Sequence, residues 1–153
     1  MTIRRNCVTL TLCILSAFST SVVVNTQQAK AEKICSNRSL YGAYEAQSAG
    51  YINNTDPYAL QGLLTYDGNG KITGTILVRS VAGQVTTNLP TQGTYQVNSD
   101  CSFTLSFQRT DGTTANYSGV VYDDGNKFSF TQTDPGTIVN TKGERVKNYN
   151  PYR

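Results

Sequence analysis

The stretch "LTYDGNGKITGT", residues 64–75, places two short β-prone segments on either side of a cluster of glycine and asparagine. Asp-Gly and Asn-Gly favour tight hairpin turns, because the central residues of such turns need a positive φ. An EF-hand calcium loop would need further acidic ligands and a final glutamate, and a phosphate-binding loop would need a helix after the glycines. The stretch therefore predicts a β-hairpin, and no metal site is expected in its turn.

Similar segments alternate with turn clusters along the chain from residue 40 onward. Their spacing of roughly 8 to 12 residues is typical of β-sandwiches and barrels. Pro90 interrupts one of the segments, so residues 84–89 and 92–98 form either two strands or one bent strand. The segments predicted to be strands are 40–48, 58–66, 71–80, 84–89, 92–98, 102–109, 114–122, 127–133 and 137–146.

Apolar residues recur at every second position in these segments, as expected for half-buried antiparallel strands. Glycines lie on the same apolar face, where they permit the sharp coiling that closes a small barrel. We therefore predict an all-β fold with a single antiparallel up-and-down eight-stranded barrel, and a β-sandwich is the alternative. The predicted core consists of Leu60, Gly62, Leu64, Ile72, Gly74, Ile76, Val78, Phe103, Leu105, Phe107, Tyr117, Gly119, Val121, Phe128 and Phe130.

The first 31 residues have a different character. Arg4 and Arg5 precede an apolar run, and "AKA" at residues 29–31 has the small-x-small form of a signal peptidase site. We predict a signal peptide over residues 1–31, a β-barrel domain over 32–147 and a flexible tail over 148–153. A retained membrane anchor is the alternative, but serines and a threonine break the run short of the ~20 apolar residues that a span needs. The protein is thus expected to be secreted or periplasmic, with no stable membrane insertion after cleavage.

Cleavage would also change the charge and the cysteine count. Of the 13 basic residues, Arg4, Arg5 and Lys30 would leave, so 10 remain against 10 acidic residues. The mature chain is then formally neutral, and no nucleic-acid partner is expected. Cys35 and Cys101 remain as the only cysteines, so one disulfide is the plain inference in an exported chain and a reactive thiol is the alternative. The oligomeric state is not predicted.

The chain contains no histidine, which excludes Ser-His-Asp and Cys-His mechanisms and the usual zinc sites. Carboxylate chemistry remains, and Glu45 is the weak catalytic candidate because it lies within an early predicted strand. If its face points into the barrel, Glu45 would be an acid or base with a raised pKa; if that face points outward, Glu45 is a solvated surface residue. The predicted ligand-binding residues are Tyr41, Glu45 and Tyr117, and no cofactor is expected.

Two arginines, Arg79 and Arg109, each end a predicted strand. At the mouth of a barrel they would suit an anionic group, and the alternative is that both are solvated strand termini. The chain also has 10 tyrosines, which suit contact with a flat ligand as well as ordinary packing between strands.

Four motifs along the chain resemble those of a family of small exported bacterial proteins with calycin-like barrels. They are, in order, "CSNRSLYGAYEAQSAG", "ALQGLLTYDGNGKITGT", "GTYQVNSDCSFTLSF" and "GVVYDDGNKFSFTQTDPGTIVNTKGERV". The resemblance covers nearly the whole mature chain. It implies a barrel similar in architecture to allene oxide cyclases and lipocalins, and a disulfide between Cys35 and Cys101. The likeness to cyclases is architectural only, so no catalytic position of a cyclase is carried over to this chain.

The function predicted from the sequence is binding of a small, partly apolar ligand inside the barrel. One alternative is a cyclase- or isomerase-type enzyme that uses Glu45 in the barrel interior. The other is a surface or matrix component that binds no ligand. The interior volume separates these hypotheses, because a barrel filled by its phenylalanines would have no room for a ligand.

Overall fold

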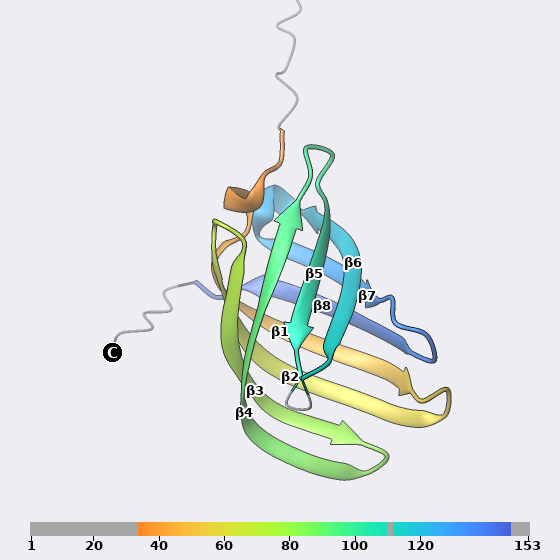
Figure 1. Cartoon of the computed structure of the whole chain (residues 1–153). Helices are drawn as coiled ribbons and strands as arrows, with labels where there is room; N and C mark the ends of the chain where they lie inside the picture. The colour runs from red at the N-terminus through yellow and green to blue at the C-terminus, as the bar shows by residue number, and fades with distance from the viewer. Residues whose placement is uncertain (1–33, 110–111, 148–153) are drawn as a thin grey trace, which may run out of the picture. The chain divides into compact units, whose positions relative to one another are not determined.

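The computed structural model describes residues 34–109 and 112–147, and within them the chain forms a closed antiparallel barrel. Each strand pairs with the next in sequence, and the barrel closes where β1 pairs with β8 (Figure 1). The predicted up-and-down eight-stranded barrel is confirmed, and the β-sandwich alternative is wrong. The predicted signal peptide and tail lie outside the described residues. The strands are β1 Tyr41–Ile52, β2 Asp56–Asp67, β3 Lys71–Val81, β4 Gln84–Val97, β5 Ser102–Gln108, β6 Thr114–Tyr122, β7 Lys127–Gln132 and β8 Ile138–Arg145.

The segment around Pro90 is one continuous strand, β4. Pro90 pairs with Thr75 of β3 on one side. On its other side β4 pairs with β5 only from Gly93 onward. Pro90 thus lies where β4 has a strand partner on one side only, which is where a sheet tolerates a residue without a backbone N–H.

The stretch at residues 64–75 forms the expected hairpin between β2 and β3. The side-chain oxygen Oδ1 of Asp67 accepts hydrogen bonds from the backbone N–H groups of Asn69 (2.7 Å) and Lys71 (2.9 Å). Gly68 and Gly70 both have positive φ, at 78° and 114°. The carboxylate of Asp67 therefore serves the turn itself.

One end of the barrel is closed by the segment before β1. This segment contains the short 3-10 helix η1 (Asn37–Ser39) and is linked to the β4–β5 turn by the disulfide Cys35–Cys101, which confirms the predicted pairing. The Oδ1 atom of Asn37 accepts a hydrogen bond from the backbone N–H of Val97 at 2.7 Å. The hydroxyl of Tyr95 lies 2.9 Å from the carbonyl oxygen of Leu40, to which it donates. These contacts fix the segment across the barrel end (Figure 1).

Aromatic side chains fill the barrel behind this closed end. The ring of Phe128 lies 5.4 Å from that of Tyr44 and 5.6 Å from that of Tyr66, and Phe103 packs beside it at 6.1 Å. Gly143 of β8 makes room for this cluster, since a Cβ atom added there would lie only 2.1 Å from the Phe128 ring. Among the described residues, the largest fully buried side chains are those of Tyr44, Tyr66, Phe103, Phe128, Leu40, Ile72 and Val139.

A β-bulge in β3 changes which side chains face the interior. Gly62 of β2 pairs with Ile76, but its neighbour Gln61 pairs with Val78, so Leu77 is an extra residue. One extra residue reverses the alternation of faces beyond it. Val78 is consequently 37% exposed, and the prediction that it belongs to the core is wrong. Arg79 takes the inward position instead.

Candidate functional site

The open end of the barrel contains a cavity of about 690 Å³. It lies among the inward-facing residues near the β1–β2, β3–β4, β5–β6 and β7–β8 connections, opposite the end that η1 closes. Its floor is formed by buried side chains of the core, among them Leu64 and Phe130, each 5% exposed. The apolar part of its wall includes Ala46, Leu60, Leu64, Ile76, Leu89, Phe107, Ala115 and Phe130.

The cavity exists because the barrel is filled unevenly. Phe103, Leu105 and Phe128 are buried at 0–2% exposure and belong to the packed half. Phe107 and Tyr117 are only half-buried, because both side chains line the cavity. Their rings pack against each other at 5.8 Å. The predicted core is therefore divided into a packed half and a cavity wall.

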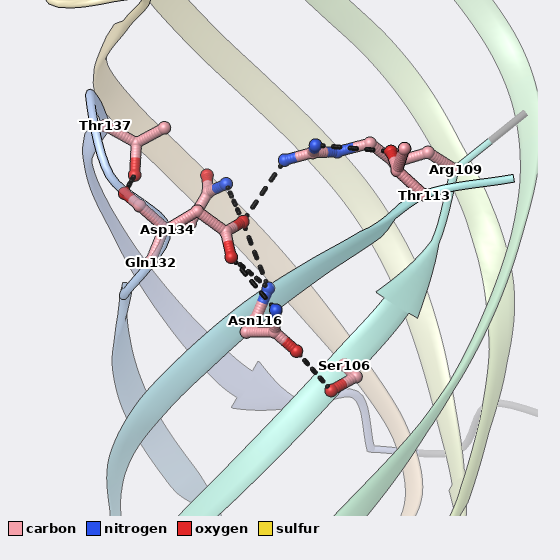
Figure 2. A network of polar contacts seen from close by, with 7 residues as sticks. All are labelled: Ser106, Arg109, Thr113, Asn116, Gln132, Asp134 and Thr137. Atoms are coloured by element: carbon pink, nitrogen blue, oxygen red, sulfur yellow. Dashed lines mark hydrogen bonds and ion pairs between the residues drawn. The ribbon is translucent and has the colours of Figure 1, made fainter. Parts of the chain in front are cut away.

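A network of polar contacts centred on Asp134 braces the rim of the cavity (Figure 2). Its carboxylate accepts hydrogen bonds from Nε2 of Gln132 (2.8 Å) and Nδ2 of Asn116 (3.0 Å), and it forms an ion pair with Nη2 of Arg109 at 3.2 Å. Thr137 donates to the backbone carbonyl of Asp134 at 2.6 Å. The network joins β6 to the β5–β6 and β7–β8 connections.

The hydrogen bonds and the ion pair outweigh the effect of burial on the Asp134 carboxyl. Burial by itself raises the pKa of Asp134, but the hydrogen bonds from Gln132 and Asn116 and the charge of Arg109 together lower that pKa. Asp134 is therefore ionised at neutral pH and its oxygens are occupied.

Arg79 lines the cavity in a different electrostatic setting. Its Nε atom is buried and has no hydrogen-bond partner. In the pairing of β2 with β3, Arg79 lies opposite Leu60, and Val81 lies opposite Tyr58. Arg79 and Tyr58 are thus diagonal neighbours on the inner face, a separation that long side chains can bridge.

Two tyrosines of the wall are affected by burial and by these charges. Burial raises the pKa of Tyr58, and the positive charges of Arg79 and Arg109 partly offset that rise. Burial also raises the pKa of Tyr117, and Tyr58 and Asp134 add to the increase while Arg109 opposes it. Both hydroxyls are therefore protonated at neutral pH and can donate hydrogen bonds.

The structure brings one of the three predicted ligand-binding residues to the cavity. Tyr117 lines its wall. Tyr41 is 64% exposed, and Glu45 lies on the same outer face of β1. The carboxylate of Glu45 accepts hydrogen bonds from Gln47 (2.9 Å) and Gln61 (2.8 Å), which lower its pKa. Of the two placements considered for Glu45, the outward one is therefore the one found.

Of the two placements considered for Arg79 and Arg109, a barrel mouth or a solvated strand end, both arginines line the cavity at the open end, and Arg109 is also exposed to solvent. Sequence reasoning missed Tyr58, Gln132 and Asp134, which lie on the same rim. A signal for Asp134 was present in the "TQTDPGT" turn, but an aspartate before proline is common in turns that bind nothing. No group of three or more potential metal ligands occurs within the described residues.

Comparison with known proteins adds little to this picture. No protein-family model matches the chain, and no curated protein matches it either. Among solved structures, the chain is similar to a de novo designed fluorescence-activating β-barrel, at 12% identity and a TM-score of 0.42, covering 72% of this chain and 96% of the designed one. This likeness is too distant to support an argument about function. No helix in the described part of the chain is long and apolar enough to cross a membrane.

Proposed function

We propose that the protein binds a small, partly apolar ligand in the cavity at the open end of its barrel. The observation that carries the proposal is the cavity itself, whose volume of about 690 Å³ falls in the range of roughly 300–1,000 Å³ typical of small-molecule sites. Its mainly apolar wall and its few polar groups at the rim are the usual composition of such a site.

Binding is better supported than catalysis because, among the described residues, no carboxylate in the cavity wall is free to transfer a proton. Glu45 lies on the outer face of β1. Asp134 is the carboxylate that lines the cavity, and its oxygens are held by Gln132, Asn116 and Arg109. A general acid or base needs an accessible group with a pKa near the working pH, whereas the pKa of Asp134 is lowered.

The disulfide supports an oxidising compartment as the place where this binding occurs. Cys35 and Cys101 are bonded, and such bonds persist in secreted and periplasmic proteins rather than in a reducing cytosol. A secreted or periplasmic protein with a ligand cavity would act by carrying or sequestering a small molecule.

The test is binding of N-phenyl-1-naphthylamine, an uncharged aromatic probe whose fluorescence rises in apolar sites. The wild-type protein should bind it. Ala115→Phe should lose the binding, because Ala115 is buried, lines the cavity and would project a ring into it. Ala59→Phe is the matched control, since Ala59 is exposed and would place the same ring outside.

Circular dichroism would show that both variants remain folded. Absence of probe binding by the wild-type protein, or equal binding by a folded Ala115→Phe variant, would count against the proposal. Native mass spectrometry of protein purified from its own organism gives an independent check, because a bound molecule would appear as an added mass.

A further inference from the structure

The charges that line the cavity do not balance. Arg109 and Asp134 form an ion pair at 3.2 Å, and so neutralise each other. Arg79 has no ion pair with any carboxylate of the described residues, and its buried Nε lacks a hydrogen-bond partner. Within the described part of the chain, one positive charge in the cavity wall therefore has no counter-charge.

The local backbone places this charge in the interior. Without the extra residue Leu77, strict alternation from Ile76 would turn Val78 inward and Arg79 outward. The bulge exchanges an apolar side chain for a cationic one at the cavity wall. A buried charged donor without a partner costs stability, and bulges occur preferentially next to binding sites, where they redirect a side chain.

The neighbours of Arg79 would support an anion. Tyr58 lines the same part of the wall, and its hydroxyl is held in the protonated, donating form by burial. Arg79 and Tyr58 are diagonal neighbours on the inner face of β2 and β3, so both groups face the same region of the cavity. Val81 and Leu60 flank them and keep the local surroundings apolar, a setting in which a charge-assisted hydrogen bond is stronger than in water.

We infer that Arg79 binds an oxyanion of the ligand, so that the ligand is an apolar molecule carrying a carboxylate or a comparable group. This inference rests on the proposed ligand-binding function. A guanidinium presents paired N–H donors that match the two oxygens of a carboxylate. The apolar body of the ligand would extend from Arg79 toward the buried floor at Leu64 and Phe130.

The test compares two ligands that differ only in their head group. Octanoate and octanol are each used to displace N-phenyl-1-naphthylamine at neutral pH, where the carboxylate is ionised. In the wild-type protein octanoate should bind about tenfold more tightly than octanol, as expected for one charge-assisted hydrogen-bonded pair. Equal affinities in the wild-type protein would overturn the inference without any variant being made.

Variants then assign the preference to a residue. Arg79→Gln should remove the preference, so that octanoate binds no more tightly than octanol. Arg79→Lys should keep part of the preference, because it retains the charge without the paired donors. Arg38→Gln is the matched control: it removes the same charge from an exposed position in η1, outside the cavity lining, and should change nothing.

The outcomes separate this inference from the proposed function. If the uncharged probe binds and octanoate keeps its advantage in Arg79→Gln, the cavity binds ligands but Arg79 is not the anion site. If the wild-type protein binds neither the probe nor octanol, the cavity is not a ligand site and both proposals fail.

Discussion

The two ends of the barrel differ in what occupies the space between the strands. At the closed end, the rings of Tyr44, Tyr66 and Phe128 lie 5.3–5.6 Å from one another, and the segment before β1 is held across them by a disulfide. At the open end, half-buried side chains surround a cavity, and Arg79 keeps a buried N–H without a partner. The same eight strands form both ends.

If the cavity binds a ligand as proposed, stability and binding are located at opposite ends of the barrel. Burial of closely packed large side chains at one end is a strong source of stability. A cavity and an unpartnered charge both reduce stability. The barrel can tolerate them at its open end when the packed closed end is stable enough to offset the loss. A variant at the closed end should therefore change stability, and a variant at the open end should mainly change binding.

The largest effect is expected when equivalent side chains are truncated at the two ends. Phe128→Ala should lower the free energy of unfolding by about 3–5 kcal/mol, the usual cost for a buried phenylalanine, because its ring is fully buried among other rings. Phe107→Ala should cost roughly half as much or less, since the Phe107 side chain is half-buried and already borders the cavity. Urea denaturation measures both values.

Equal losses in the two phenylalanine variants would contradict the division between a packed and an open end. Binding of N-phenyl-1-naphthylamine provides the second comparison. A folded Phe107→Ala variant should show altered probe binding, whereas Phe128→Ala should leave probe binding intact under conditions where it remains folded.

A smaller effect is expected from pH at the closed end. Burial raises the pKa of Tyr44 to about 12, and burial together with the charge of Asp67 raises that of Tyr95 to about 12, from the usual tyrosine value of 10.0. Below pH 10 the hydroxyls are protonated in both the folded and the unfolded chain. As the pH rises from 10 toward 12, the unfolded chain releases protons that the folded chain retains, so stability falls.

Thermal denaturation measured at several pH values between 9 and 12 would follow this loss. Tyr44→Phe should flatten the curve, because it removes one proton released on unfolding. It should also lower stability at neutral pH by about 1 kcal/mol, because the hydroxyl donates a hydrogen bond to the carbonyl of Gly125 at 2.6 Å. The exposed Tyr122 is the control position, and an equal flattening in Tyr122→Phe would contradict the assignment.

The sequence was sufficient to predict the barrel but not to predict what faces its interior beyond the bulge. Period-two alternation and turn dipeptides act locally, and they located every strand to within a few residues. The run Ile76, Leu77 and Val78 is apolar at three consecutive positions, so either alternation fits it. The bulge at Leu77 depends on the pairing with β2, which local patterns do not encode.

The outward position of Glu45 was within reach of sequence reasoning. Glu45 shares its face with Gln47 and Tyr41, whereas Tyr44 and Ala46 lie on the opposite face, and polar residues usually face solvent.

The tyrosines were harder to place. Tyr44, Tyr66 and Tyr95 form much of the packed end, yet the chemistry of a strand tyrosine suits both contact with a ligand and packing in a core.

The smallest effect is expected at the ion pair that distinguishes Arg109 from Arg79. Asp134→Asn should lower the free energy of unfolding by about 1 kcal/mol, because it weakens the contacts with Gln132, Asn116 and Arg109. It should also free Arg109 as a second cation at the cavity rim and so raise the affinity for octanoate by roughly two- to fivefold, with octanol unaffected.

In the wild-type protein, Asp134 contributes stability above the unfolded pKa of 3.8 and loses it as the pH falls through its lower folded pKa. Acid denaturation of the variant should therefore begin from a lower stability but fall less steeply. If Asp134→Asn left octanoate binding unchanged while Arg79→Gln abolished the preference for octanoate, Arg109 would be a purely structural residue and Arg79 alone would define the anion site.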